Sequence, residues 1–291
     1  MYMKAIKTVL FILLVVSFTS CEDVIQVKLD EGQPIVTVDA FVNDMRSQQK
    51  VRLTYTDSYF SQKPNTVITG ATVKIKDLTS GIVYDFTDNN DGNYVYTPGA
   101  TDTMGRVGHN YELTVTHQGN VFTSICRMNR TTQVDSIISE FKEGGGLANT
   151  KPGNAMSFLG FDVPGDTIDY YWIKSYRNGV FFNKGGDINI CADGAYANGA
   201  DGFPFIPPIA QGITPFGERF QKNDICRVEI HSINVETFNF LTQVQTQTTN
   251  SGLFATSPEN IKTNLKSSND KVKVVGWFCM SAVGYKERVV D

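Results

Sequence analysis

Residues 36–42 read VTVDAFV, and this stretch decides the fold class of the chain. Its apolar residues stand at every second position, which is the period of a β-strand with one buried face. The same period returns in further short runs, at residues 51–55, 73–75, 82–86, 94–96, 111–115 and 121–126. Seven or so short strands spaced roughly 8–12 residues apart, with no helical window among them, predict a β-sandwich of about 100 residues.

A different pattern begins near residue 132, where residues 134–138 start a new strand. We therefore expect an N-terminal sandwich over residues 34–131 and a C-terminal β-rich domain over residues 132–291, because domains usually have about 100–150 residues. Within the second domain, apolar residues at helical spacing follow Ser232 or Asn234, either of which can cap a helix. The expected fold class is mainly β, with two β-sandwich domains, the second carrying a helical insertion and a long loop.

The N-terminus has the layout of an exported lipoprotein. Two lysines precede an apolar run over residues 9–18, and Thr19-Ser20 stands directly before Cys21. This order is typical of a secretory signal peptide, and a cysteine after the small residues is the lipobox arrangement of bacterial lipoproteins. A membrane-spanning helix would need roughly 20 apolar residues. We expect residues 1–20 to be removed and Cys21 to carry the lipid; a plain signal peptide with an incidental cysteine is the alternative.

Residues 21–33 follow as an acidic and polar tether. Glu22 and Asp23 directly after the cysteine resemble the signal that sends lipoproteins of the Bacteroidota to the outer face of the outer membrane. The alternative is that these acids only keep a linker solvated. Bacterial lipoproteins carry several acyl chains, and two or more chains hold a protein stably at a membrane. We therefore expect a lipid-anchored protein of the outer membrane that faces the cell exterior.

The charge and motif content of the chain exclude several classes of function. Loss of residues 1–20 removes two of the 26 basic residues and none of the 30 acidic residues, so the net charge changes from −4 to −6. This mild acidity argues against a nucleic-acid partner, which requires a basic face. The three histidines are scattered, and no HExxH, GxSxG, Walker A or dinucleotide-binding motif is present. We expect a protein without catalytic residues, metal site or cofactor; an enzyme of unrecognised type is the alternative.

Four cysteines remain after Cys21, namely Cys126, Cys191, Cys226 and Cys279. An even number in an exported chain suggests two disulfides, and the lack of any CxxC pair argues against a zinc site. A Cys191–Cys226 bond is the first choice, because it would close the long loop between these residues at its base. Four buried free thiols are the alternative.

The 34 residues between Cys191 and Cys226 show no secondary-structure period. Long loops of this kind are usually functional or disordered, and this loop is too apolar for a disordered linker. Phe203, Phe205 and Ile206 stand among prolines and are the candidate contact with a partner protein. The alternative is that the loop folds back and covers the core of its own domain.

Trp172 and Trp277 raise a second possibility for the function. Exposed aromatic rings can stack on sugar rings or other planar ligands, which would make the chain a glycan- or ligand-binding module. Aromatic residues within strands more often belong to the core. Buried indole rings would therefore remove this binding surface.

Several motifs together resemble a family of Bacteroidota lipoproteins, catalogued as domain of unknown function 4249. The resemblance lies in residues 21–25, 36–42, 70–75, 92–94, 110–115, 135–137 and 275–278, and residues 108–115 are also similar to a strand of transthyretin-like and immunoglobulin-like modules. Members of the family are typically encoded beside TonB-dependent outer-membrane receptors, and the family has no assigned catalytic residues. The resemblance implies an accessory subunit of such a receptor or of a related envelope complex, which is the function we expect.

Overall fold

The computed structural model describes residues 32–58, 61, 63–145, 150–165, 167–193, 201–250, 255 and 259–291. The expected signal peptide, Cys21 and nearly all of the tether lie outside the described residues. Residues 34–291 form one compact unit that is mainly β, as the alternating pattern predicts. No helix of the described part is both long and apolar enough to cross a membrane.

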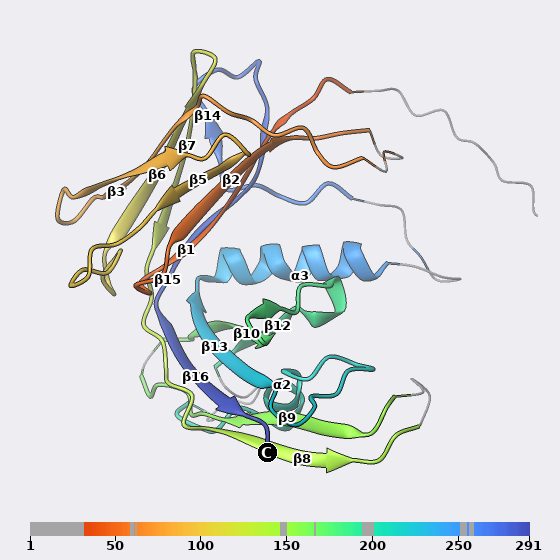
Figure 1. The fold of residues 1–291 in the computed structure, drawn as a ribbon. Helices are drawn as coiled ribbons and strands as arrows, with labels where there is room; N and C mark the ends of the chain where they lie inside the picture. The colour runs from red at the N-terminus through yellow and green to blue at the C-terminus, as the bar shows by residue number, and fades with distance from the viewer. Residues whose placement is uncertain are drawn as a thin grey trace, which may run out of the picture. The chain divides into compact units, whose positions relative to one another are not determined.

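A nine-stranded sheet contains all seven strands expected in the N-terminal half (Figure 1). They are β1 (Val36–Asn43), β2 (Gln49–Tyr55), β3 (Thr72–Asp77), β4 (Val83–Asp88), β5 (Asn93–Tyr96), β6 (Asn110–His117) and β7 (Asn120–Arg127). Two strands from the C-terminal half complete the sheet, β14 (Lys266–Ser267) beside β7 and β15 (Val274–Ser281) beside β1. The spatial order is β14-β7-β6-β3-β4-β5-β2-β1-β15.

The first sheet curls around its own apolar face. Large side chains such as Tyr94, Tyr111, Phe122 and Phe278 are at most 1% exposed inside it. Strands β7 and β15 lie far apart in the strand order, yet the Met280 amide donates to the Cys126 sulfur over 3.3 Å. The two ends of the sheet therefore approach each other, which gives this half of the molecule a barrel-like form.

The second sheet has the order β11-β10-β13-β16, and β12 also pairs with β10. Its strands are β10 (Tyr170–Arg177), β11 (Val180–Phe181), β12 (Asn189–Ala192), β13 (Ile225–Ile233) and β16 (Val283–Val289). One face of this sheet forms a second core with the hairpin of β8 (Ser136–Lys142) and β9 (Gly153–Leu159) and with the short helix α2 (Pro207–Gln211). A single 3-10 turn, η1 (Gly185–Asp187), precedes β12.

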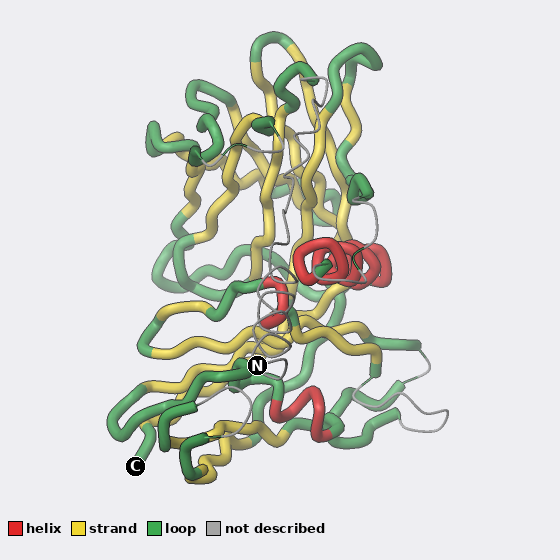
Figure 2. The backbone as a smooth tube through the Cα atoms, turned by 90° about the vertical axis from the view of Figure 1, so that its right-hand side faces the viewer, coloured by secondary structure: helices red, strands yellow, loops and turns green. Residues whose placement is uncertain are grey.

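The expected helix is α3 (Val235–Thr249), and Asn234 caps it by accepting a 2.9 Å hydrogen bond from the Thr237 amide. This helix lies between the two sheets (Figures 1 and 2). The Trp277 indole N–H on β15 donates to the Thr237 hydroxyl over 2.9 Å, and Phe238 packs on Tyr170 of β10 with ring centroids 5.3 Å apart. The helix therefore contacts both sheets through residues of its first turn.

The chain crosses between the sheets more often than the sequence pattern indicates. The expected boundary near residue 132 falls where the chain leaves β7 and enters β8. Later, β15 returns to pair in parallel with β1, from Val36 opposite Val274 to Asn43 opposite Ser281. Strand β15 contributes to the core built by residues 36–127, and β14 joins the same sheet beside β7. After Ala282 alone, β16 begins in the second sheet.

The expected disulfides are wrong, because all four described cysteines are buried free thiols. Cys191 lies opposite Tyr171 and Cys226 opposite Arg177, on two strands that flank β10 from opposite sides. The two positions are six residues apart along β10, which is about 20 Å, whereas a disulfide joins Cα atoms less than about 7 Å apart. Cys126 and Cys279 lie in the other core. The cysteines act as small apolar side chains, the alternative that the sequence left open.

Gly276 allows β1 and β15 to approach each other. Its φ is +109°, and a Cβ atom there would lie 1.9 Å from the Val38 carbonyl oxygen. We expect Gly276→Ala to lower the free energy of unfolding by at least ~3 kcal/mol, because the new methyl group would force the paired strands apart. Gly119→Ala is the matched control: its φ is also positive, but nothing lies within 4 Å, so only ~1 kcal/mol should be lost. Equal losses in urea unfolding would contradict this role for Gly276.

Candidate functional site

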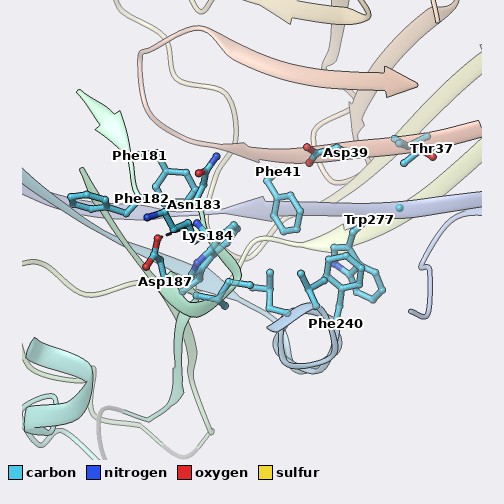
Figure 3. Close-up of a pocket in the computed structure, with 16 residues that line it drawn as sticks. Thr37, Asp39, Phe41, Phe181, Phe182, Asn183, Lys184, Asp187, Phe240 and Trp277 are labelled. Carbon is cyan, nitrogen blue, oxygen red and sulfur yellow. Dashed lines mark hydrogen bonds between the residues drawn. The ribbon is translucent and has the colours of Figure 1, made fainter. Parts of the chain in front are cut away.

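A pocket of about 360 Å³ opens between β1, β10, β15, α3 and the segment that follows β10 (Figure 3). Aromatic side chains from all these elements make up most of its wall. They are Phe41, Trp172, Phe181, Phe182, Phe240 and Trp277. We call this site the aromatic pocket. Most ligand sites have this composition, an apolar wall with a few polar groups.

Strand and helix periodicity place these side chains. On β1, Val38 and Ala40 point into the first core, so Thr37, Asp39 and Phe41 point outward. Helix α3 turns Phe240, Leu241 and Val244 toward this outer face. The helix covers the face incompletely, and the aromatic pocket is the space that remains.

The aromatic rings contact one another closely. Phe240 stacks on Trp277 with centroids 4.4 Å apart and planes at 17°. Trp172 meets Phe41 edge to face at 5.2 Å. Trp277 is only 5% exposed, so its ring offers no open platform for a sugar, whereas the half-buried Trp172 contributes an edge of the pocket wall.

Three polar groups beside the aromatic pocket have no hydrogen-bond partner among the described residues. The Lys174 ammonium lies 3.9 Å from the Trp172 ring centroid and 5.8 Å from that of Phe181. Burial lowers the pKa of Lys174 to about 8, although nearby acidic groups counteract this effect. The Thr37 hydroxyl is buried and unpaired, and the Asp39 carboxylate stands at the exposed rim.

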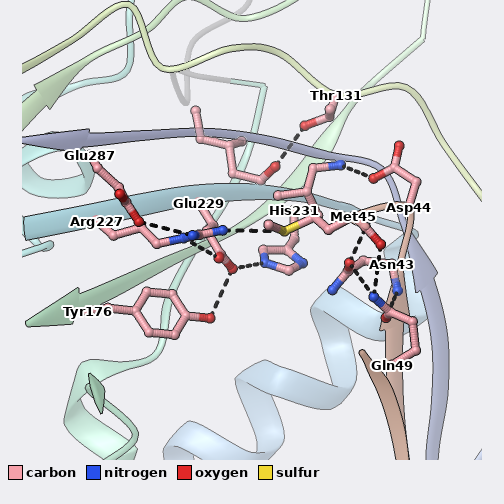
Figure 4. A network of polar contacts seen from close by, with 12 residues as sticks. Asn43, Asp44, Met45, Gln49, Thr131, Tyr176, Arg227, Glu229, His231 and Glu287 are labelled. Atoms are coloured by element: carbon pink, nitrogen blue, oxygen red, sulfur yellow. Dashed lines mark hydrogen bonds and ion pairs between the residues drawn. The ribbon is translucent and has the colours of Figure 1, made fainter. Parts of the chain in front are cut away.

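A polar network lies on the same face of the second sheet (Figure 4). Glu229 is 6% exposed and accepts hydrogen bonds from the Tyr176 hydroxyl at 2.9 Å and from the His231 Nε2 at 2.8 Å. Arg227 donates to it through Nε at 2.7 Å and also pairs with Glu287 at 3.0 Å. This network borders the aromatic pocket, because the His231 and Trp172 rings are 6.3 Å apart.

The protonation states of this network follow from burial and pairing. Burial alone would raise the pKa of Glu229, but the hydrogen bonds from His231 and Tyr176 and the charge of Arg227 lower it to about 2. Burial and the positive Lys174 lower the pKa of His231 to about 4, although the hydrogen bond to Glu229 and the charge of Glu229 act to raise it. At neutral pH the carboxylate is therefore ionised and the imidazole neutral. The described residues hold no group of three His, Cys, Asp or Glu side chains that fits a metal ion.

This network predicts a loss of stability in mild acid. The unfolded chain protonates His231 below about pH 6.5, whereas the folded chain resists protonation down to about pH 4. The stability due to the neutral imidazole is thus complete above pH 6.5 and falls by on the order of 3 kcal/mol toward pH 4. In urea unfolding across this range, His231→Gln should flatten the pH dependence, since glutamine can still donate to Glu229. A His117→Gln control, at a half-buried site, should keep most of the slope; an unchanged slope in His231→Gln would contradict the assignment.

The structure separates the three residues predicted to contact a partner. Phe205 is 6% exposed and packs against Phe158 and Tyr171, each with centroids 5.4 Å apart. Ile206 is partly buried against the second core. Only Phe203 is well exposed, at 56%. Phe205 and Ile206 therefore follow the alternative expectation, in which the loop folds back and covers the core of its own domain. Residues 194–200 of this loop lie outside the described residues.

Sequence reasoning missed most of the aromatic pocket, because its residues come from distant elements. Trp172 and Trp277 were singled out as separate exposed rings, and the structure brings them to one pocket. A usable signal was present at Phe41. It occupies the outward series of β1 with Thr37 and Asp39, where a large apolar residue indicates that something covers this face.

The family assignment rests on a sequence comparison. No curated protein matches the chain. Among solved structures, the crystal structure of chicken CNTN1 FN1-FN3 domains matches with 12% identity over 72% of this chain. The match spans 65% of that chain, and its TM-score of 0.23 is too low to support an argument about fold. The family model described as domain of unknown function (DUF4249) matches residues 22–287, so the chain belongs to this family.

Proposed function

We propose that this protein is a non-enzymatic lipoprotein, anchored through Cys21 at the outer face of the outer membrane, that serves as an accessory subunit of a TonB-dependent receptor or a related envelope complex. The lipobox, the acidic residues after Cys21 and the resemblance to Bacteroidota lipoproteins support the location. The observation that carries the docking role is an exposed apolar surface at one end of the second core.

Three large apolar side chains near the bridge between Phe161 and Pro204 are exposed, and we call them together the docking surface. They are Leu159, Phe161 and Phe203, which are 39%, 44% and 56% exposed. The Asp162 amide donates to the Phe203 carbonyl over 2.9 Å, and Phe161 bridges to Pro204, so two chain segments hold the surface together. Phe205 on one of these segments is anchored in the core. Apolar side chains on such a fixed backbone lose little entropy on binding, and a few of them can supply most of the binding energy.

A binding role without catalysis is supported by the polar network. Glu229 already accepts hydrogen bonds from Tyr176, Arg227 and His231. A general base needs a lone pair that a substrate proton can reach, and Glu229 is only 6% exposed. The interactions of Glu229 instead join β10 to β13, and Arg227 extends them to Glu287 on β16, so the network serves to fix the second sheet.

The docking surface can be tested with Phe161→Ser/Phe203→Ser. We expect near-normal thermal stability, because both side chains are largely exposed, together with loss of partners in affinity purification from solubilised outer membranes. Val180→Ser, at a 69% exposed site on β11, is the control and should retain the partners. Retention of every partner by the double variant would refute this surface.

The anchor is tested separately. We expect Cys21→Ala to move the protein from the membrane fraction to the soluble fraction, because the acyl chains would have no attachment site. Surface proteolysis of intact cells checks the side of the membrane on which the wild-type protein lies. A Cys21→Ala protein that stays membrane-bound would rule out the lipid anchor, and full protection of the wild type would place it on the periplasmic side.

A second candidate function is the binding of a small ligand through aromatic side chains. The aromatic pocket favours it, because six aromatic residues line a cavity of about 360 Å³ beside three polar groups that have no hydrogen-bond partner in the described part of the chain. The closely packed rings favour a compact apolar ligand over a glycan.

A further inference from the structure

We propose that the aromatic pocket binds a small carboxylate with an aromatic or alicyclic body, and that Lys174 is the partner of the carboxylate group. This inference rests on the second candidate function and names the class of its ligand.

The size and wall of the aromatic pocket select the body of the ligand. A cavity of about 360 Å³ accommodates one or two rings. Phe41 and Trp172 stand on strands, while Phe240 stands on a helix that packs against both sheets. These walls are fixed before the ligand arrives, so an apolar body gains the full benefit of leaving water.

Lys174 selects the charge of the ligand. Trp172 and Lys174 are two residues apart on β10 and therefore share the face that bears the aromatic pocket. The ammonium carries three donors, and it forms no ion pair or hydrogen bond with another described residue. Its ring neighbours are Trp172, Phe181 and Phe41, with centroids 3.9, 5.8 and 6.0 Å from the nitrogen, and a ring face accepts an N–H more weakly than a carboxylate oxygen does. A carboxylate would supply a charge-assisted hydrogen bond to a cation that has already lost part of its water.

Three further groups refine the choice. Thr37 lines the pocket, and its buried hydroxyl lacks a partner among the described residues, so a rotation about its Cα–Cβ bond would let it donate to a second oxygen of the ligand. Glu229, opposite Lys174 on β13, and Asp39 both stand near enough to influence the charge of Lys174, and both would repel an anion. However, Glu229 is already paired with Arg227, and the Asp39 side chain is more exposed than that of Lys174. The more desolvated group gains more from a new partner, which favours an anionic over a cationic ligand.

Three probes with one common body test the class of ligand: phenylbutanoate, phenylbutanol and phenylbutylamine. Calorimetric titration of the protein should show about tenfold tighter binding of the acid than of the alcohol, the usual effect of one charge-assisted hydrogen bond. The amine should bind most weakly. Tryptophan fluorescence gives a second readout, because both tryptophans of the chain line the pocket.

The variants have opposite expected effects. Lys174→Met should remove the preference for the acid while keeping affinity for the alcohol. Asp39→Asn should strengthen binding of the acid by a few fold and leave the alcohol unchanged. Lys184→Met is the matched control, since it removes an exposed lysine from the pocket rim and should retain most of the preference. Val244→Trp should block all three probes by filling the pocket from α3.

The outcomes distinguish the carboxylate assignment from the existence of the ligand site. Equal affinity for acid and alcohol, with no response to Lys174→Met or Asp39→Asn, would overturn the carboxylate assignment but keep ligand binding. Tighter binding of the amine than of the acid would also overturn the carboxylate assignment but keep ligand binding. No binding of any probe to the wild type would overturn the ligand site itself. Because Asp39 lies at the exposed rim, its variant still tests the charge assignment if Lys174→Met fails to fold.

Discussion

The parallel pairing of β1 with β15 is the constraint on which the rest of the molecule depends. Strand β1 lies near the start of the described chain and β15 near its end, so this ladder closes a loop of more than 200 residues. Eight residue pairs form it, and Gly276 in the third pair leaves room for the backbone of Val38. Without this ladder, the first sheet would lack a side of its barrel-like core, since Phe278, Cys279 and Met280 are fully buried there.

The same ladder also positions the second sheet. Strand β15 passes into β16 through Ala282, whose amide donates to the Ser232 hydroxyl over 2.9 Å. The second sheet therefore turns one face toward β1 and α3, and Trp172, Lys174, Glu229 and His231 lie on this face. The polar network is tolerated there because each buried charge in it is paired, and pairing offsets the cost of removing a charge from water. The aromatic pocket arises where β1, β10, β15 and α3 meet without filling the space between them.

Local patterns predicted much of the fold, and contacts between distant residues account for most of the differences. Apolar residues at every second position were sufficient to predict β1 to β7. Apolar residues at helical spacing, with Asn234 as the cap, were sufficient to predict α3. Both signals lie within a few residues of sequence. The position of β15 beside β1 could not be read in this way, since a parallel partner more than 200 residues away leaves no turn signal. The cysteine prediction failed for a related reason. Spacing along the chain does not show that β10 separates Cys191 from Cys226.

The two candidate binding surfaces lie on opposite faces of β10. Tyr171 points into the second core, where its hydroxyl donates to Asp162 over 2.5 Å and its ring meets Phe205, while the next residue, Trp172, points into the aromatic pocket. Strand alternation therefore separates the docking surface, anchored by Phe205, from the ligand site. Substitutions at sites that share no contact usually have additive effects. A loss of partner binding and a loss of ligand binding can thus be assigned to separate surfaces, although a single strand supports both.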